Sequence, residues 1–193
     1  MKKIVTGLVL LSLGSSMALA GDYYGGVNLD FGKGGEEWIE NGTTKYDFSN
    51  TSYGLHLGYN LNKNSMVELS FKSLTFDFKN NNLSDEDGTQ FGIDYLYAFD
   101  TTSELKIKPY LGIGLNVNSK DISVEGLNED SIDGFGLKIR VGGRYSLTPK
   151  LDLGVDLNYN MIGWQDLQNN NTDSTAELST RFYALGLNIN YKF

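Results

Sequence analysis

The end of the chain alternates strictly between large apolar side chains and small or polar ones. The apolar positions are Tyr183, Leu185, Leu187, Ile189, Tyr191 and Phe193, and between them lie Ala184, Gly186, Asn188, Asn190 and Lys192. Successive side chains of a β-strand point to opposite faces, so this two-residue period predicts a strand with one apolar and one polar face. Such a strand needs partners with the same pattern.

Seven earlier segments carry the pattern. They lie at residues 27–31, 53–59, 67–78, 91–99, 111–117, 135–145 and 151–161, and in most of them the apolar residues are odd-numbered. With the terminal strand they predict an all-β fold of eight antiparallel strands. A tilted strand needs roughly 9 to 11 residues to cross a bilayer, and the longer of these segments have about this length.

One segment departs from the regular phase. Val67, Leu69 and Phe71 are followed by Leu74 and Phe76, so the apolar set changes from odd to even near Ser73. One extra residue in a strand exchanges its two faces. The change therefore predicts either a β-bulge or the point at which the strand leaves the membrane.

The connections alternate in length. Residues 60–65, 100–107 and 146–150 form short connections, whereas 32–50, 79–88, 119–133 and 163–180 are mostly longer and rich in polar residues and glycine. Short turns at one rim and longer loops at the other are typical of outer-membrane β-barrels. The predicted barrel therefore displays four extracellular loops, and both ends of the chain lie on the periplasmic side.

Alternation alone fits two barrels, because the apolar face can point outward to lipid or inward as in a soluble carrier of the lipocalin kind. The polar face is rich in glycine, for example Gly54, Gly58, Gly112 and Gly114. Small residues suit the narrow interior of an eight-stranded barrel better than a wall facing water. Aromatic residues also gather near the strand ends, as in the girdles of membrane barrels. We therefore predict that the apolar face contacts lipid.

The start of the chain has the features of a secretory signal. Lys2 and Lys3 precede an apolar run at residues 4–13, and Ala18-Leu19-Ala20 follows. The run is about half of the ~20 residues that a membrane-spanning helix needs. We expect a signal peptide at residues 1–20 and one barrel domain at 21–193. The chain has no cysteine and 24 acidic against 16 basic residues, which argues against disulfides and against nucleic acid as a partner.

Four stretches carry a family resemblance: DYYGGVNLDFGKG, KPYLGIGLNV, FGLKIRVGGRYSLTPKLDLGVDLNYN and the final YKF. The chain resembles the small outer-membrane β-barrels of the opacity-protein and outer membrane protein A membrane-domain type. We expect a monomer in the Gram-negative outer membrane, in contact with lipid and lipopolysaccharide, and the resemblance implies contact with a host cell surface or matrix. It also implies that Tyr191 and Phe193 form the signal read by the barrel-assembly machinery.

Charged residues on the polar face predict an ion-pair network in the lumen. Its members are Glu68, Lys72, Asp94, Lys138, Arg140, Arg144, Asp152 and Asp156. If Tyr145 lies opposite Leu151, then Arg144 meets Asp152 and Arg140 meets Asp156. The network either plugs the barrel or lines a polar ion path, and a plug is favoured because unpaired charges in a confined lumen are costly.

Catalytic and metal sites are weakly indicated. His56 is the only histidine, and Ser70 with Glu68 can approach it in one strand register. A nucleophile and base need hydrogen-bond contact and access for the substrate, so we expect a polar interior histidine and no enzyme. The acidic run at residues 85–88 and the acidic residues at 125–133 lack the spacing of a calcium loop. We expect no metal and no cofactor.

The long loops contain large apolar residues amid polar sequence, above all Trp38 and Trp164, with Ile39 and Leu167 beside them. Exposed aromatic residues often anchor protein partners, although packing within the loops or contact with lipopolysaccharide explains them equally well. The expected function is structural, adhesive or both. A narrow channel for ions or small solutes is the first alternative, and a lipid-acting outer-membrane enzyme is the second.

Overall fold

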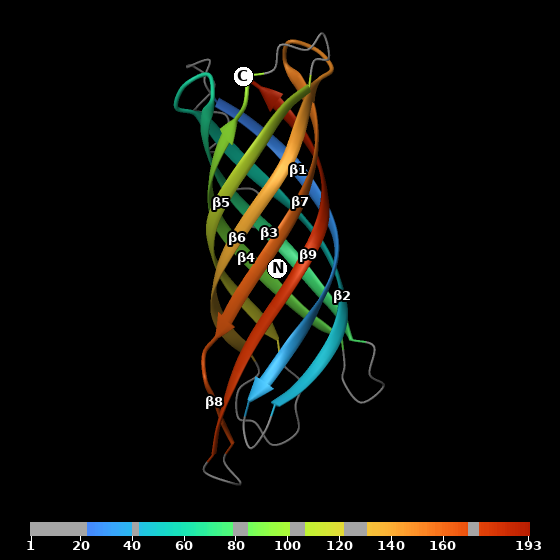
Figure 1. Cartoon of the computed structure of the whole chain (residues 1–193), viewed down its shortest axis with the longest axis vertical. Helices are drawn as coiled ribbons and strands as arrows, with labels where there is room; N and C mark the ends of the chain where they lie inside the picture. Colours follow the sequence, from blue (N-terminus) through green and yellow to red (C-terminus); the bar gives the residue numbers. More distant parts are fainter. Residues whose placement is uncertain (1–22, 40–42, 79–84, 101–106, 122–130, 170–173) are drawn as a thin grey trace, which may run out of the picture.

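The chain forms a closed antiparallel β-barrel (Figure 1). The computed structural model describes residues 23–39, 43–78, 85–100, 107–121, 131–169 and 174–193. The expected signal peptide therefore lies outside the described residues. In the described ranges, no helix has the length and hydropathy needed to cross a membrane.

Eight long strands follow one another around the barrel and a short one extends its rim. They are β1 (Tyr23–Ile39), β2 (Thr43–Asn60), β3 (Ser65–Phe78), β4 (Glu86–Ala98), β5 (Ile107–Asp121), β6 (Ser131–Ser146), β7 (Leu151–Trp164), β8 (Leu167–Asn169) and β9 (Ser174–Lys192). Strands β1 to β7 pair with their neighbours in sequence order. β7 then pairs with β9, and β9 pairs with β1 to close the barrel. Closure leaves no unpaired edge among the long strands. The predicted fold class is confirmed.

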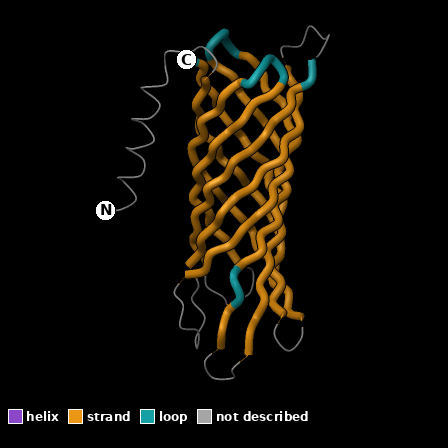
Figure 2. Tube along the Cα trace, turned by 90° about the vertical axis from the view of Figure 1, so that its left-hand side faces the viewer, coloured by secondary structure: helices purple, strands orange, loops and turns teal. Residues whose placement is uncertain are grey.

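The strands run further than the sequence predicted at the rim opposite the C-terminus, which we call the long-loop rim. There β1 and β2 pair up to Ile39 and Thr43, and β9 begins at Ser174, where β8 pairs with it. The strands end at unequal heights on this rim (Figure 2). The prediction that residues 32–50 and 163–180 are loops is therefore wrong for most of their length.

No bulge interrupts β3. Its pairing with β2 is continuous from Asn60 opposite Met66 to Phe48 opposite Phe78, so the two faces are never exchanged. Leu74 and Phe76 point inward and are buried. What changes at Ser73 is the chemistry of both faces, because outward positions become polar and inward ones become apolar. Of the two explanations offered by the sequence, exit from the apolar belt is the one that fits.

The odd-numbered apolar side chains form a belt around the outside. Ile113, Phe135 and Tyr183 are each more than half exposed, at 54%, 59% and 57%. The belt ends toward the long-loop rim in a ring of one large side chain per long strand: Phe31, Tyr53, Phe71, Phe91, Val117, Phe135, Met161 and Tyr183. The even-numbered residues turn into the barrel, so the predicted outward direction of the apolar face is confirmed.

Glycine makes room for large groups in this interior. A Cβ atom on Gly58 would collide with the ring of Tyr24, and one on Gly114 would collide with the carboxylate of Asp94. Both glycines face inward, on strands that neighbour those of the side chains they admit. The narrow barrel therefore holds large interior side chains at positions where the facing residue of the wall is glycine.

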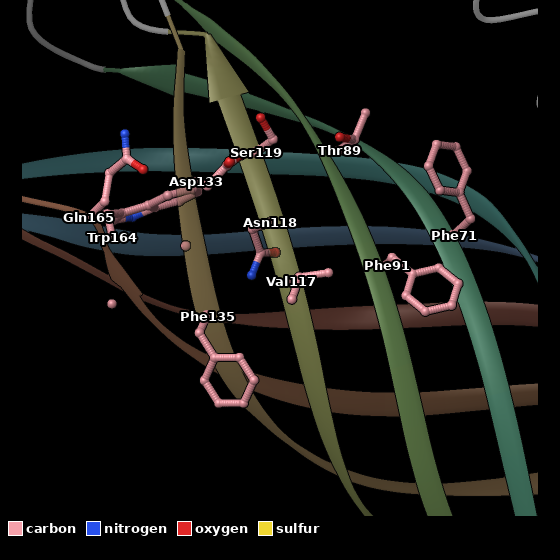
Figure 3. A pocket seen from close by; sticks show the side chains of 12 residues that line it. Phe71, Thr89, Phe91, Val117, Asn118, Ser119, Asp133, Phe135, Trp164 and Gln165 are labelled. Carbon is pink, nitrogen blue, oxygen red and sulfur yellow. The ribbon is translucent and has the colours of Figure 1, made fainter. Parts of the chain in front are cut away.

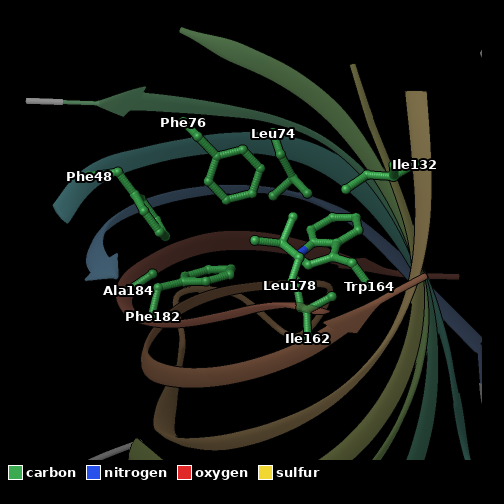
Figure 4. Close-up of a cluster of buried hydrophobic side chains, with 9 residues drawn as sticks. All are labelled: Phe48, Leu74, Phe76, Ile132, Ile162, Trp164, Leu178, Phe182 and Ala184. Carbon is green, nitrogen blue, oxygen red and sulfur yellow. The ribbon is translucent and has the colours of Figure 1, made fainter. Parts of the chain in front are cut away.

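Two buried apolar clusters occupy the interior at different heights. The inner cluster, near the short turns, contains Tyr24, Met66, Leu96, Ala98 and Tyr110. The outer cluster, near the long-loop rim, contains Phe48, Leu74, Phe76, Ile132, Ile162, Trp164, Leu178, Phe182 and Ala184. In Figure 4 the side chains of the outer cluster point into the space that the strands enclose. Between the two clusters lies the polar part of the lumen.

Candidate functional site

The central lumen holds a balanced set of charges. Four basic side chains, Lys72, Lys138, Arg140 and Arg144, form ion pairs with four carboxylates, Asp30, Glu68, Asp94 and Asp156. All eight side chains are at most 12% exposed. Burial of a charge is tolerable only where it is paired and hydrogen-bonded, and this layer meets that condition.

Glu68 is the centre of the layer. It lies directly opposite Asp94 in the pairing of β3 with β4, a placement that is unfavourable for two carboxylates alone. Arg140 Nη1 lies 2.5 Å from Glu68 Oε2, and Arg144 pairs with the other oxygen. Tyr24 donates a hydrogen bond of 2.8 Å to Glu68. The two guanidinium groups and the phenol thus compensate the carboxylate on both sides.

Arg140 links three carboxylates across the lumen. Besides Glu68 it reaches Asp94 at 3.2 Å and Asp156 at 3.0 Å. Lys138 lies 2.7 Å from Asp94, and Tyr110 donates a hydrogen bond of 2.7 Å to Asp156. Together these contacts connect side chains of β3, β4, β5, β6 and β7 across the lumen, and Arg140 takes part in three of them.

Asp30 is a member of this layer that the sequence analysis missed. Its carboxylate lies 2.6 Å from Lys72 Nζ and accepts a hydrogen bond of 2.7 Å from Ser52. Lys72 was placed in the lumen but without this partner. Asp30 lies between Leu29 and Phe31, which point outward, so the two-residue alternation of this strand already predicts that Asp30 points into the lumen.

The predicted register of β6 with β7 is wrong by two residues. Tyr145 lies opposite Leu153 rather than Leu151, so Arg144 faces Gly154 and does not meet Asp152. Asp152 instead pairs with Lys192 at 2.7 Å near the short turns. The turn at residues 147–150 closes with hydrogen bonds from Leu147 and Thr148 to Leu151, which sets this register.

A second charged cluster lies within the outer apolar cluster, at residues that the sequence analysis assigned to loops. Lys120 Nζ lies 2.5 Å from Glu36 and 2.6 Å from Glu86, and all three side chains are buried. Lys120 also lies 5.1 Å from the ring of Trp164. Among the described residues, Glu36 and Glu86 share this one cation.

The two carboxylates of this cluster differ in their surroundings. Glu36 accepts a further hydrogen bond of 3.0 Å from Thr180, which in turn accepts one of 2.7 Å from Trp164 Nε1. Burial raises the pKa of Glu86 above its ordinary value, against the opposing effect of Lys120, and the charge on Glu36 adds to the rise. Glu86 is therefore protonated more easily than an ordinary glutamate side chain.

The two tryptophans do not lie in loops. Trp164 ends β7, is 7% exposed and packs in the outer cluster, so it is not an exposed anchor for a partner. It turns inward because its position continues the even-numbered face of β7. Trp38 lies in β1, paired with Thr44 and Leu178, and its neighbour Ile39 ends that strand.

His56 and Ser70 lie directly opposite each other in the register of β2 with β3. Their side chains are not hydrogen-bonded to each other: His56 Nε2 lies 2.5 Å from Asn190 Oδ1, and Ser70 Oγ has no hydrogen-bond partner in the described part of the chain. Both face the closed interior. A substrate in the bilayer has no described route to them.

The acidic run at residues 85–88 is divided between the two faces of β4. Glu86 points inward to Lys120, whereas Asp87 accepts a hydrogen bond of 3.0 Å from Thr75 on the outside. Among the described residues, no group of three metal-ligating side chains converges. Glu125, Glu129 and Asp130 lie outside the described residues.

Two small spaces lie among the described residues inside the barrel. A cavity of about 100 Å³ opens near the short turns between Tyr24, Tyr110 and Arg144. Deeper in the lumen, a void of about 10 Å³ lies between Asp30, Lys72 and Phe182. Around these two spaces the described side chains occupy the lumen, as expected for a barrel of this width.

Two grooves lie instead on the outer surface, both at the edge of the apolar belt. The larger, about 620 Å³, crosses β3 to β6, where Phe71, Phe91, Val117 and Phe135 line it (Figure 3). Asp133 lies at its rim. The smaller, about 460 Å³, lies over β7, β9, β1 and β2 and has Lys33 at its rim.

The C-terminal strand is held at the barrel seam. Tyr191 and Phe193 project outward with ring centroids 5.7 Å apart, and the Phe193 amide donates a hydrogen bond of 3.1 Å to the carbonyl of Tyr23. Their exposed fractions are 46% and 36%. Both rings are therefore accessible at the short-turn rim.

The sequence model of the family described as "Outer membrane protein beta-barrel domain" matches residues 6–193. The chain belongs to this family. This outer-membrane β-barrel protein accordingly resides in the Gram-negative outer membrane, where its apolar belt contacts lipid. Its short-turn rim is periplasmic and its long-loop rim extracellular, in keeping with the arrangement of such barrels.

Two solved structures illustrate the fold. Neisserial surface protein A is 24% identical, with a TM-score of 0.54, over 90% of this chain and 98% of that one. The outer membrane protein OprG from Pseudomonas aeruginosa is 17% identical, with a TM-score of 0.58, over 90% of this chain and 97% of that one. At these identities the likeness concerns the fold alone. No curated protein sequence matches this chain significantly.

Proposed function

We propose that this outer-membrane protein is a closed, non-conducting barrel that stiffens the membrane and presents a rigid rim for contact with other surfaces. The observation that carries the proposal is the continuous pairing of β1 with both β2 and β9 beyond Phe31, up to Ile39. Backbone pairing on both sides holds this part of the rim as sheet rather than as loose loop. Such a platform suits adhesion, and a host cell surface or matrix is the partner we infer.

The filled lumen supports a structural role over a channel. The outer cluster, the central charge layer and the inner cluster follow one another along the barrel axis. An ion crossing this lumen would have to displace paired charges and two apolar layers. We also propose that the barrel has no catalytic activity, since His56 is hydrogen-bonded to Asn190 and not to Ser70.

The experiment compares attachment to host cells and matrix by bacteria that display the parent protein or a variant with a trimmed rim. In the variant, residues 37–45 are replaced by Asn-Gly between the paired residues Glu36 and Tyr46, which keeps the register of the hairpin. The same change replaces residues 165–177 between Trp164 and Leu178. Both junctions retain the buried contacts of Glu36 and Trp164.

Heat-modifiable migration in gels verifies that each barrel has folded. Loss of attachment on trimming, with equal amounts of folded barrel, is the expected result. Equal attachment by the parent and the trimmed variant would refute the adhesive rim. Absence of attachment by both would leave the structural part of the proposal alone.

A further inference from the structure

We propose that the groove over β7, β9, β1 and β2 binds one molecule of the phosphorylated glycolipid of the outer leaflet, the lipid A part of lipopolysaccharide. The inference goes beyond the adhesive role and depends only on the placement of the barrel in the outer membrane. Its evidence is the position of two basic residues, the shape of the groove beside them, and the contrast with the opposite side of the barrel.

Lys33 and Arg181 are the basic residues. Both are exposed and point outward, one step beyond the ring that contains Phe31 and Tyr183. Lys33 lies opposite Tyr183, and Arg181 lies opposite Gly35, so the two are diagonal neighbours on β1 and β9. Side chains of this length on diagonal positions, roughly 7–8 Å apart, can converge on one anion.

Neither basic residue has an ion-pair partner in the part of the chain that the structure describes, whereas Lys45, further out, pairs with Glu37 at 3.5 Å. Two carboxylates lie on diagonals from these cations: Asp47 from Lys33 across β2, and Glu37, which pairs with Lys45, from Arg181 across β1. Two unpaired cations at the level of the lipid headgroups attract phosphate, and arginine offers a two-pronged donor for it.

The groove begins directly below these cations. Its walls are Phe31, Leu157, Tyr183 and Leu185, and Lys33 and Thr51 lie at its upper margin. A volume of about 460 Å³ admits part of an acyl chain with little rearrangement of the wall. A lipid whose phosphate meets Lys33 and Arg181 thus extends its chains down the apolar surface.

The opposite side of the barrel lacks this combination. The larger groove is lined by Phe71, Phe91 and Phe135 but has Asp133 at its margin and no basic residue among its lining (Figure 3). Asp87 and Asp121 are also exposed there, at the same outer rim. A phosphorylated headgroup is repelled on that side, so charge selects the smaller groove.

The test measures lipid binding by native mass spectrometry of the refolded barrel, with bisphosphorylated lipid A and with dephosphorylated lipid A as probes. We expect the parent to prefer the bisphosphorylated form. Lys33→Gln and Arg181→Gln should each weaken its binding about fivefold, the effect of one cation at an anionic lipid surface. The double substitution should abolish the preference, and Lys150→Gln at the periplasmic rim should change nothing.

Two further variants test the groove and the competing charge. Thr51→Trp fills the groove and should weaken binding of both lipids, while Asp47→Asn removes a repelling carboxylate and should strengthen binding of the phosphorylated one. Equal binding by the parent and the folded double variant would overturn the proposal. So would inorganic phosphate that displaces lipid A at equal concentration, because the acyl chains would then contribute nothing.

Discussion

At the scale of the residue, the interior of this barrel depends on complementary sizes. Large side chains such as Tyr24 fit because Gly58 has no side chain in their way, and Asp94 fits beside Gly114 for the same reason. Charges are matched as closely as sizes, since each central carboxylate faces at least one cation. A change at an inward position should therefore cost far more than the same change on the outside.

Gly58→Ala tests the steric part of this account. The added methyl group displaces the ring of Tyr24 and disturbs its hydrogen bond to Glu68, so we expect a loss of about 1–3 kcal/mol in the free energy of unfolding. Gly163→Ala is the control, because nothing lies within 4 Å of its added Cβ. Equilibrium urea unfolding in lipid vesicles measures both. A similar stability for both variants would contradict the close packing.

The Lys120 cluster gives an electrostatic prediction. Lys120→Met leaves Glu36 and Glu86 buried without their cation and should destabilise the barrel by about 3–5 kcal/mol. Glu86→Gln removes one of the two carboxylates that share Lys120 and should leave stability unchanged or higher. The order of the two variants in urea unfolding is the result that matters, and the reverse order would contradict the shared cation.

The pH dependence of stability has the same origin. Because the pKa of Glu86 is raised in the folded protein, the folded state binds a proton more readily than the unfolded chain. The unfolding free energy of the parent relative to Glu86→Gln should therefore rise as the pH falls from neutral through the raised pKa toward the ordinary value of 4.5. A difference that stays constant over this range would contradict the assignment.

At the scale of the element, the sequence predicts the strands well and their ends poorly. The two-residue period fixes the inward and outward faces of β4, β5 and β9, because one face contacts lipid and the other a narrow lumen. Beyond the lipid the outward face becomes polar and the inward face apolar, so the pattern inverts, as at Ser73. In the sequence, this inversion has the same pattern as a bulge in β3 and as the start of a loop in β1 and β2, although all three strands continue.

The site was only partly predictable for a related reason. Because Glu68, Arg140 and Asp156 occupy even-numbered positions in alternating strands, the sequence alone places them in the lumen. Their partners are set by contacts across the barrel, between strands far apart in the chain, as in the pairs of Arg140 with Glu68 and Lys120 with Glu36. A single sequence does not indicate which side chains meet across the lumen. A register error of two residues between β6 and β7 is enough to assign Asp152 the wrong partner.

Phe76→Ala tests the direction of β3 beyond the membrane. Phe76 is 1% exposed and packs edge-to-face on Phe48 with ring centroids 5.1 Å apart. Its truncation should cost about 3–5 kcal/mol, whereas Asp77→Ala on the exposed outward face should cost less than about 0.5 kcal/mol. Unfolding in urea reports both values. Comparable losses would indicate that the strand is not oriented as described.

The last strand carries a prediction on assembly. We propose that Tyr191 and Phe193, exposed at the periplasmic rim, are recognised by the barrel-assembly machinery. Deletion of Phe193 should lower the amount of folded barrel in cells while leaving refolding of the purified chain into vesicles nearly unchanged. Equal losses in both settings would mean that the residue acts through stability, for instance by its hydrogen bond to Tyr23.

At the scale of the whole molecule, the barrel separates its tasks along its axis. The apolar belt meets lipid, the filled interior supplies stability without cysteine, and the strands beyond the belt build a rim of paired backbone. The exterior beyond the belt also differs around the axis. On β1, β2 and β9 the cations Lys33, Lys45 and Arg181 offset Glu37, Asp47 and Glu177, whereas the described residues beside Asp87, Asp121 and Asp133 at this rim include no exposed cation. Lipid contact and surface contact are thus assigned to different parts of one closed structure.

The closed lumen is the central claim, and single-molecule conductance across a planar bilayer tests it most directly. The folded parent should give no discrete current steps at neutral pH. Arg140→Ala should be less stable than the parent yet still non-conducting, because the apolar clusters on either side of it remain. Reproducible current steps from the parent, which vanish when the barrel is unfolded, would show an open path and contradict the account.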